Sequence, residues 1–76
     1  MTLPFYVVKA AFDDEAEVWF VEHSDVPGLS TEAPSFDELC RKVGVMASEL
    51  LEANHLALGP VEIIAHASAK LSLDAA

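Results

Sequence analysis

The sequence is short of cysteine and of basic residues, and each shortage excludes a class of protein. Cys40 is the only cysteine among 76 residues, so no disulfide can form within the chain and a secreted disulfide scaffold is excluded. Four Lys and Arg stand against thirteen Asp and Glu, which gives a formal net charge of -9. Because nucleic-acid affinity comes mainly from basic side chains that neutralise phosphates, direct binding to DNA or RNA is disfavoured.

Long apolar runs and glycine clusters are missing as well. No stretch approaches the roughly 20 apolar residues of a membrane span. Residues 1–10 also lack the basic flank and the apolar run of a signal peptide, so we expect a cytoplasmic protein. The three glycines, Gly28, Gly44 and Gly59, are isolated from one another. The chain therefore has neither a phosphate-binding loop nor a dinucleotide-binding fingerprint.

The reactive side chains do not have the spacing of a catalytic or metal site. His23, His55 and His66 are spread along the chain without metal-ligand spacing. Cys40 falls on the apolar side of a predicted helix, where a cysteine behaves as a small hydrophobic residue. The acidic run at residues 13–17 lacks the alternating ligands and the glycine of a calcium loop. We therefore predict no enzyme activity, no cofactor and no metal.

The composition that is present indicates a packed domain. Hydrophobic residues make up 53% of the chain and charged residues 22%, which favours a folded core over disorder. The length gives room for a single domain, residues 1–76, near the lower limit of what folds alone. We therefore expect a homo-oligomer, a dimer or higher. The acidic charge would also steer a basic protein partner towards the domain.

Two segments near the N-terminus predict a β-hairpin. Residues 5–12 and 17–23 are rich in β-branched and aromatic residues, and the polar residues 13–16 between them suit a reversal. The register stays open. If Phe12 faces Glu17, one face of the hairpin holds Tyr6, Val8, Ala10, Phe12, Trp19 and Val21. A slip of one residue places Val18 and Phe20 on that face instead.

A turn and a capped helix follow the hairpin. Pro27 and Gly28 have the chemistry of a type II turn, because proline fixes φ and glycine accepts the positive φ that comes next. Residues 29–33 would then form a short third strand antiparallel to the second, and Pro34 separates it from a helix. Ser35 is the predicted N-cap of this helix, with Glu38 completing a capping box.

The predicted helix runs from Phe36 to about residue 53. Its apolar residues repeat at helical spacing, which indicates one buried stripe: Phe36, Leu39, Cys40, Val43, Met46, Ala47, Leu50 and Leu51. Residues 61–73 then alternate between apolar and mostly polar positions, which predicts a last strand. The order β-β-β-α-β predicts an α+β fold, an antiparallel sheet with a single helix packed on one face.

One face of such a sheet has no helix to cover it. Both hairpin strands carry apolar side chains on both faces, so the uncovered face is predicted to be an apolar patch that binds a second copy or another protein. Trp19 could be an anchor of this surface, because buried Trp residues dominate many interfaces. The alternative is that Trp19 is an ordinary core residue.

The turn at residues 25–28, called here the corner, and the start of the predicted helix resemble those of a known family. The matching residues are Asp25, Val26, Pro27 and Gly28, then Thr31 and Glu32, then Ser35, Glu38 and Leu39. Through them, over roughly residues 5–55, the chain resembles the HicB antitoxin family and its small stand-alone relatives of unknown function. Ser24 and the pair Ala33-Pro34 depart from the usual residues, which places the chain nearer the stand-alone relatives.

The resemblance implies a binding function. HicB proteins pair with HicA, a small basic toxin that cleaves messenger RNA, and cover its RNA-contacting surface. By this likeness the chain would be an antitoxin-like module that neutralises a small basic ribonuclease. The alternative is a homo-oligomeric structural or regulatory domain with no toxin partner.

Eight residues are candidates for the binding surface or for its scaffold. Asp25 can contact a basic partner, or it can accept backbone N–H bonds and hold the turn. The candidate partner-binding residues are Trp19, Val21, Asp25 and Glu32, and the candidate turn and cap residues are Pro27, Gly28, Ser35 and Glu38.

Overall fold

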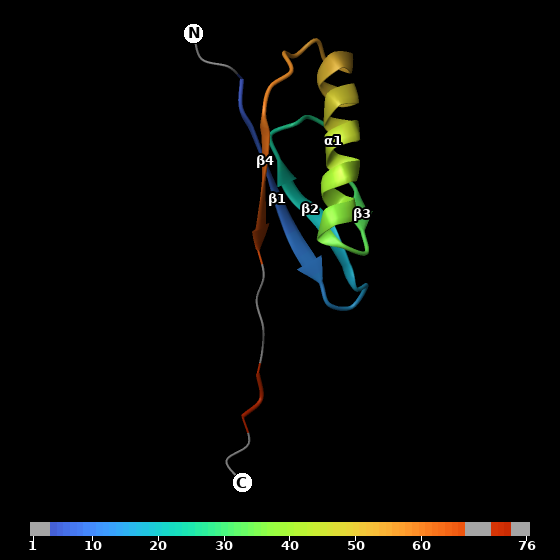
Figure 1. The fold of residues 1–76 in the computed structure, drawn as a ribbon, viewed down its shortest axis with the longest axis vertical. Coiled ribbons are helices and arrows are strands. Elements are labelled where there is room, and N and C mark those ends of the chain that lie inside the picture. The colour runs from blue at the N-terminus through green and yellow to red at the C-terminus, as the bar shows by residue number, and fades with distance from the viewer. Residues whose placement is uncertain (1–3, 67–70, 74–76) are drawn as a thin grey trace.

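The computed structural model describes residues 4–66 and 71–73, and its elements follow the predicted order (Figure 1). The strands are β1 (Tyr6–Asp13), β2 (Val18–Ser24), β3 (Glu32–Ala33) and β4 (Val61–His66), and the helix is α1 (Phe36–Ala53). The predicted α+β class with a single helix is confirmed. The last strand is shorter than predicted: residues 67–70 lie outside the described residues, and residues 71–73 are not in a strand.

The four strands form one mixed sheet in the order β3-β2-β1-β4. β1 and β2 are antiparallel, as are β2 and β3, whereas β4 lies parallel to β1. The sheet is therefore not antiparallel throughout. The direction of β4 follows from the helix, because a helix that crosses over the sheet brings the chain back to the end at which the preceding strand began. β4 thus runs in the direction of β3, which is also that of β1.

In the hairpin, Trp19 and Val21 lie on the same face as Phe12, as in the first of the two predicted arrangements, but the pairing of the strands is shifted by two residues. Phe12 lies opposite Trp19, not Glu17, and the turn occupies residues 14–17. Asp13 closes this turn: its Oδ1 accepts the Glu15 N–H at 3.0 Å, and its carbonyl accepts the Glu17 N–H at 2.8 Å. A shift of two residues leaves every side chain on its face, since side chains alternate with a period of two.

The core lies between α1 and one face of the sheet. Ser35 is the N-cap, and its Oγ accepts the Glu38 N–H at 3.2 Å, so the predicted helix start is confirmed. The buried helix residues have the predicted spacing, and they pack against the sheet and the corner. The buried core consists of Leu39, Val43, Ala47 and Leu51 from α1 with Val8, Ala10, Val26, Leu29 and Ala33.

The helix does not cover the sheet evenly. In Figure 1, α1 lies over the side of the sheet formed by β2 and β3, and β4 forms the opposite edge. Val61 and Ile63 of β4 are half-buried against the core, whereas Ile64, Ala65 and His66 are exposed. The second half of β4 is therefore bare on both of its faces.

Candidate interaction surface

The face of the sheet turned away from α1, called here the outer face, carries an apolar strip between charged residues. Paired residues share a face, so the register places two rows of side chains side by side across it. One row, from β3 to β4, is Glu32, Phe20, Ala11 and His66. The next row is His23, Lys9 and Ile64.

Burial along the outer face is graded. Ala11 is 8% exposed although no helix covers it, because its neighbours Phe20 and His66 flank it. Val7, Val18 and Phe20 are half-buried, and Ile64 is 44% exposed. The predicted apolar patch is therefore present only in part, as a narrow strip of Val7, Ala11, Val18, Phe20 and Ile64 with the exposed Lys9 in its middle. Its rim is acidic, with exposed carboxylates at Asp13, Glu22, Glu32 and Glu62.

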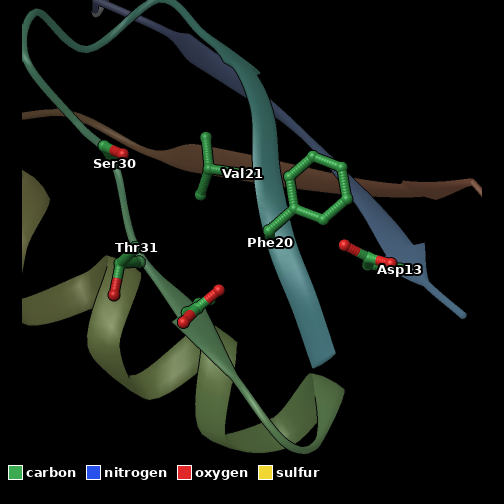
Figure 2. Close-up of a pocket in the computed structure, with 6 residues that line it drawn as sticks. Asp13, Phe20, Val21, Ser30 and Thr31 are labelled. Atoms are coloured by element: carbon green, nitrogen blue, oxygen red, sulfur yellow. The ribbon is translucent and has the colours of Figure 1, made fainter. Parts of the chain in front are cut away.

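A shallow hollow of about 360 Å³ lies where this strip meets β3. Figure 2 shows the Phe20 ring projecting from β2, with the Asp13 carboxylate beyond it and Ser30 and Thr31 on the segment that leads into β3. Glu32 and Val21, two of the predicted partner-binding residues, also line the hollow. An aromatic ring between two carboxylates and two hydroxyls suits an Arg or Lys side chain, since carboxylates accept charge-assisted hydrogen bonds and the ring face attracts a cation.

Trp19 and Val21 lie on the other face of β2, under the helix. The Trp19 ring packs edge-on between Phe12, at a centroid distance of 5.4 Å, and Phe36, at 5.3 Å. Both Trp19 and Val21 are half-buried and pack against the core. Of the two readings of Trp19, the structure therefore favours the core residue. The aromatic residue that β2 presents on the outer face is Phe20.

Asp25 holds the corner to the first strand. Its Oδ2 accepts the Val7 N–H at 2.9 Å, and its own N–H donates to the Val7 carbonyl at 3.0 Å. The pair of bonds extends the β1–β2 ladder past the end of β2. The Asp25 carboxylate is exposed, but one of its oxygens already accepts the Val7 N–H. The structure therefore favours the role of holding the turn over that of contacting a partner.

The Pro27-Gly28 turn forms as predicted. Gly28 has φ of +76°, which glycine adopts without the strain of a Cβ atom, and the Leu29 N–H donates to the Val26 carbonyl at 3.3 Å. Ser24 Oγ accepts the Val26 N–H at 2.9 Å. Val26 and Leu29 are consequently buried against the helix, and the corner acts as the support for β3.

Glu32 sits on the β3 edge with its side chain on the outer face. Val21 donates its N–H to the Thr31 carbonyl at 3.1 Å, so the next residue, Glu32, directs its backbone groups away from β2. Its carbonyl accepts a hydrogen bond from Lys42 Nζ at 2.8 Å. Glu32 is the predicted partner-binding residue that the structure places beside Phe20.

Sequence reasoning did not select Phe20 and Ile64, two of the larger apolar side chains on the outer face. The alternation in the hairpin contained the signal for Phe20, because it lies on the opposite face from Trp19 in either register. For Ile64 the signal was an apolar residue at a position where the alternation in residues 61–66 otherwise places polar residues.

Two further findings concern metal ions and membrane spans. In residues 4–66 and 71–73, no group of three or more His, Cys, Asp or Glu side chains is arranged to hold a metal ion. Within those same ranges, the helix is not both long and apolar enough to cross a membrane.

Comparisons with known proteins agree on one small domain. The model of the family described as Domain of unknown function (DUF1902) matches residues 5–73. The chain is 46% identical to a hypothetical protein of the extremely thermophilic bacterium Thermus thermophilus, whose crystal structure it matches with a TM-score of 0.70. That match covers 92% of this chain and 100% of the other. Among curated proteins no significant match is found.

Proposed function

The chain belongs to the family of the Domain of unknown function (DUF1902), and we propose that it is a protein-binding module of antitoxin type. Its outer face would cover the RNA-contacting surface of a small basic ribonuclease of the HicA kind. The observation that carries this proposal is the acid-rimmed apolar strip, with the Phe20 hollow at one end. The resemblance of the corner and the capped helix to HicB proteins supports the same class of partner.

The chemistry of the strip suits a surface that otherwise binds phosphate. RNA-binding surfaces hold phosphates with Arg and Lys, and a carboxylate takes the same side chains through charge-assisted hydrogen bonds. The hollow offers Asp13 and Glu32 for this purpose, and Phe20 offers an apolar contact between them. The net charge of -9 would also accelerate the encounter with a basic partner.

The test is inhibition of a ribonuclease. A small basic protein encoded beside the gene for this chain would be purified, and its cleavage of RNA measured with increasing amounts of the chain. We expect inhibition that is complete near equal amounts and that weakens as salt is raised, since the attraction is between opposite charges. A basic neighbour whose cleavage continues unchanged would contradict the proposal.

Two charge-reversal variants separate a local contact from the overall charge. Glu32→Lys alters the hollow, whereas Glu49→Lys makes the same charge change on an exposed position of α1. We expect Glu32→Lys to weaken inhibition by at least about tenfold, the equivalent of roughly 1.4 kcal/mol. Glu49→Lys should have a much smaller effect. Equal effects would mean that the outer face is not the binding surface.

A further inference from the structure

The edge of the sheet formed by β4 has backbone N–H and C=O groups that point away from β1. The Tyr6 N–H donates to the Pro60 carbonyl at 3.1 Å, and Tyr6 lies opposite Val61 in the parallel ladder. In such a ladder alternate residues bond to the neighbouring strand, so Glu62, Ile64 and His66 direct their backbone groups to β1. Val61, Ile63 and Ala65 direct theirs outwards, where the described residues contain no further strand.

Among the residues that the structure describes, this edge also lacks the features that usually prevent pairing. Natural sheets protect an edge with a very short strand, a lysine or proline, a bulge, or a covering segment. β4 is six residues long, contains neither lysine nor proline, and pairs with β1 in an unbroken register. Its exposed side chains include Ile64 and Ala65, one on each face.

From these observations we propose that two copies of the chain associate through β4, which pairs antiparallel with the second copy's β4 to form a continuous eight-stranded sheet. A two-fold axis normal to the sheet keeps both helices on one side, and it requires the outward residues to face one another. Two registers satisfy this requirement over most of the strand, one centred on Ile63 and the other on Ile64.

Side-chain chemistry selects the register centred on Ile64. In this register Ile64 lies opposite the second copy's Ile64, so the exposed apolar side chain of each copy is covered by the other. Glu62 lies opposite the second copy's His66, and the reciprocal pair is the same, so on both sides of the axis a carboxylate can accept a hydrogen bond from an imidazole ring. The register centred on Ile63 would instead place each Glu62 opposite an Ile64.

Self-association through β4 is separate from the binding of a basic partner, because it uses the edge and not the hollow. It is therefore measured on the purified chain alone. Sedimentation should show a mass that rises with protein concentration from the 8.2 kDa of one chain towards twice that value. Two chains of net charge -9 repel one another, so higher salt should strengthen this association. A chain that stays monomeric at every concentration and salt would overturn the proposal.

Cysteine cross-linking tests the register. In a Cys40→Ala background, Ile64→Cys places two thiols at a directly opposed position without ladder bonds, where Cα atoms are about 4.5 Å apart and a disulfide can form. Ile63→Cys is the matched control, because the two Ile63 positions are then diagonal neighbours, about 7–8 Å apart. We expect a covalent dimer on mild oxidation for Ile64→Cys only. Cross-linking of Ile63→Cys to the same extent, or of neither variant, would overturn the register.

A proline variant tests the use of the backbone. Ala65→Pro removes an N–H that points outwards, so it leaves the ladder with β1 intact and should abolish the dimer without unfolding the chain. Ala65→Val keeps the N–H and should keep the dimer. If Ala65→Pro does not fold, the pair of Glu62 and His66 decides: Glu62→Lys should weaken the dimer, and adding His66→Glu should restore it. A dimer that persists in Glu62→Lys would contradict the pairing.

Discussion

The β3 edge and the β4 edge of the sheet differ in length, in covering and in the state of their backbone groups. β3 has two residues, with Ala33 buried under α1 and the outward carbonyl of Glu32 bonded to Lys42 Nζ. β4 has six residues, and its second half is exposed on both faces.

The difference between the two edges indicates which one is available for pairing. A two-residue strand offers too few backbone groups to bind another chain, and a lysine already occupies one of them. At β4, the outward positions Val61, Ile63 and Ala65 have no such protection from the part of the chain that the structure describes. The helix lies over the first edge, so the second edge carries both the weaker packing and the greater capacity for association.

The largest expected difference between the two edges is in core packing. Leu39→Ala, in the part of the core beneath α1, should lower the free energy of unfolding by about 2–5 kcal/mol, because it leaves a cavity at a fully buried position. Ile63→Ala on half-buried β4 should cost about 1–2 kcal/mol, a fraction of the roughly 1.5–3 kcal/mol of full burial. Urea unfolding at low protein concentration measures both. Equal losses would show that β4 is packed as firmly as the helix.

A second difference concerns the segment that leads into β4. A Cβ atom on Gly59 would overlap the Pro4 carbonyl oxygen, so Gly59→Ala must displace the start of β4 or the residues before β1. We expect a loss of about 1–3 kcal/mol, as for other overpacked sites. Gly44→Ala is the control, because a Cβ there meets no atom within 4 Å, and it should stabilise the helix by up to about 1 kcal/mol. Thermal unfolding distinguishes a loss from a gain.

The elements governed by local chemistry could be predicted from the sequence. The N-cap at Ser35, the start of α1 at Phe36 and the positive φ of Gly28 each depend on a few neighbouring residues, and all three were predicted. The sheet face of Trp19 could not be settled from the sequence, because a shift of one residue in the pairing of β1 with β2 moves Trp19 to the other face. This pairing is set by the turn, which the Asp13 side chain closes.

The position and direction of β4 depend on contacts between distant segments. The alternation of residues 61–73 predicts a strand but does not say which strand it joins. Among the described residues, Val61–His66 pair with β1. The alternation continues to residue 73, whereas residues 71–73 are not in a strand, so the pattern overstates the strand. Leu71 and Leu73, on the apolar side of that alternation, are 81% and 89% exposed.

A smaller effect is expected at the start of the helix beside β3. Ser35→Ala should lower the free energy of unfolding by about 1 kcal/mol, because the Glu38 N–H loses its acceptor. Ser35→Asp keeps an acceptor at the N-cap and should restore most of that loss. Chemical unfolding of the three chains measures the difference. An unchanged stability in Ser35→Ala would mean that the cap contributes nothing to holding this end of α1 over β3.

The smallest expected effect comes from opening the β3 edge. Lys42→Met keeps most of the apolar stem but removes the hydrogen bond to the Glu32 carbonyl, which water can replace because the site is exposed. The free energy of unfolding should fall by about 0.5 kcal/mol or less, and Arg41→Met serves as a neighbour with the same change of charge. Sedimentation should show no added association in Lys42→Met relative to Arg41→Met, because two residues remain too short a template even when unprotected. Larger assemblies in Lys42→Met alone would show that the lysine, and not the length of β3, keeps this edge from pairing, and the two edges would then differ only in their protection.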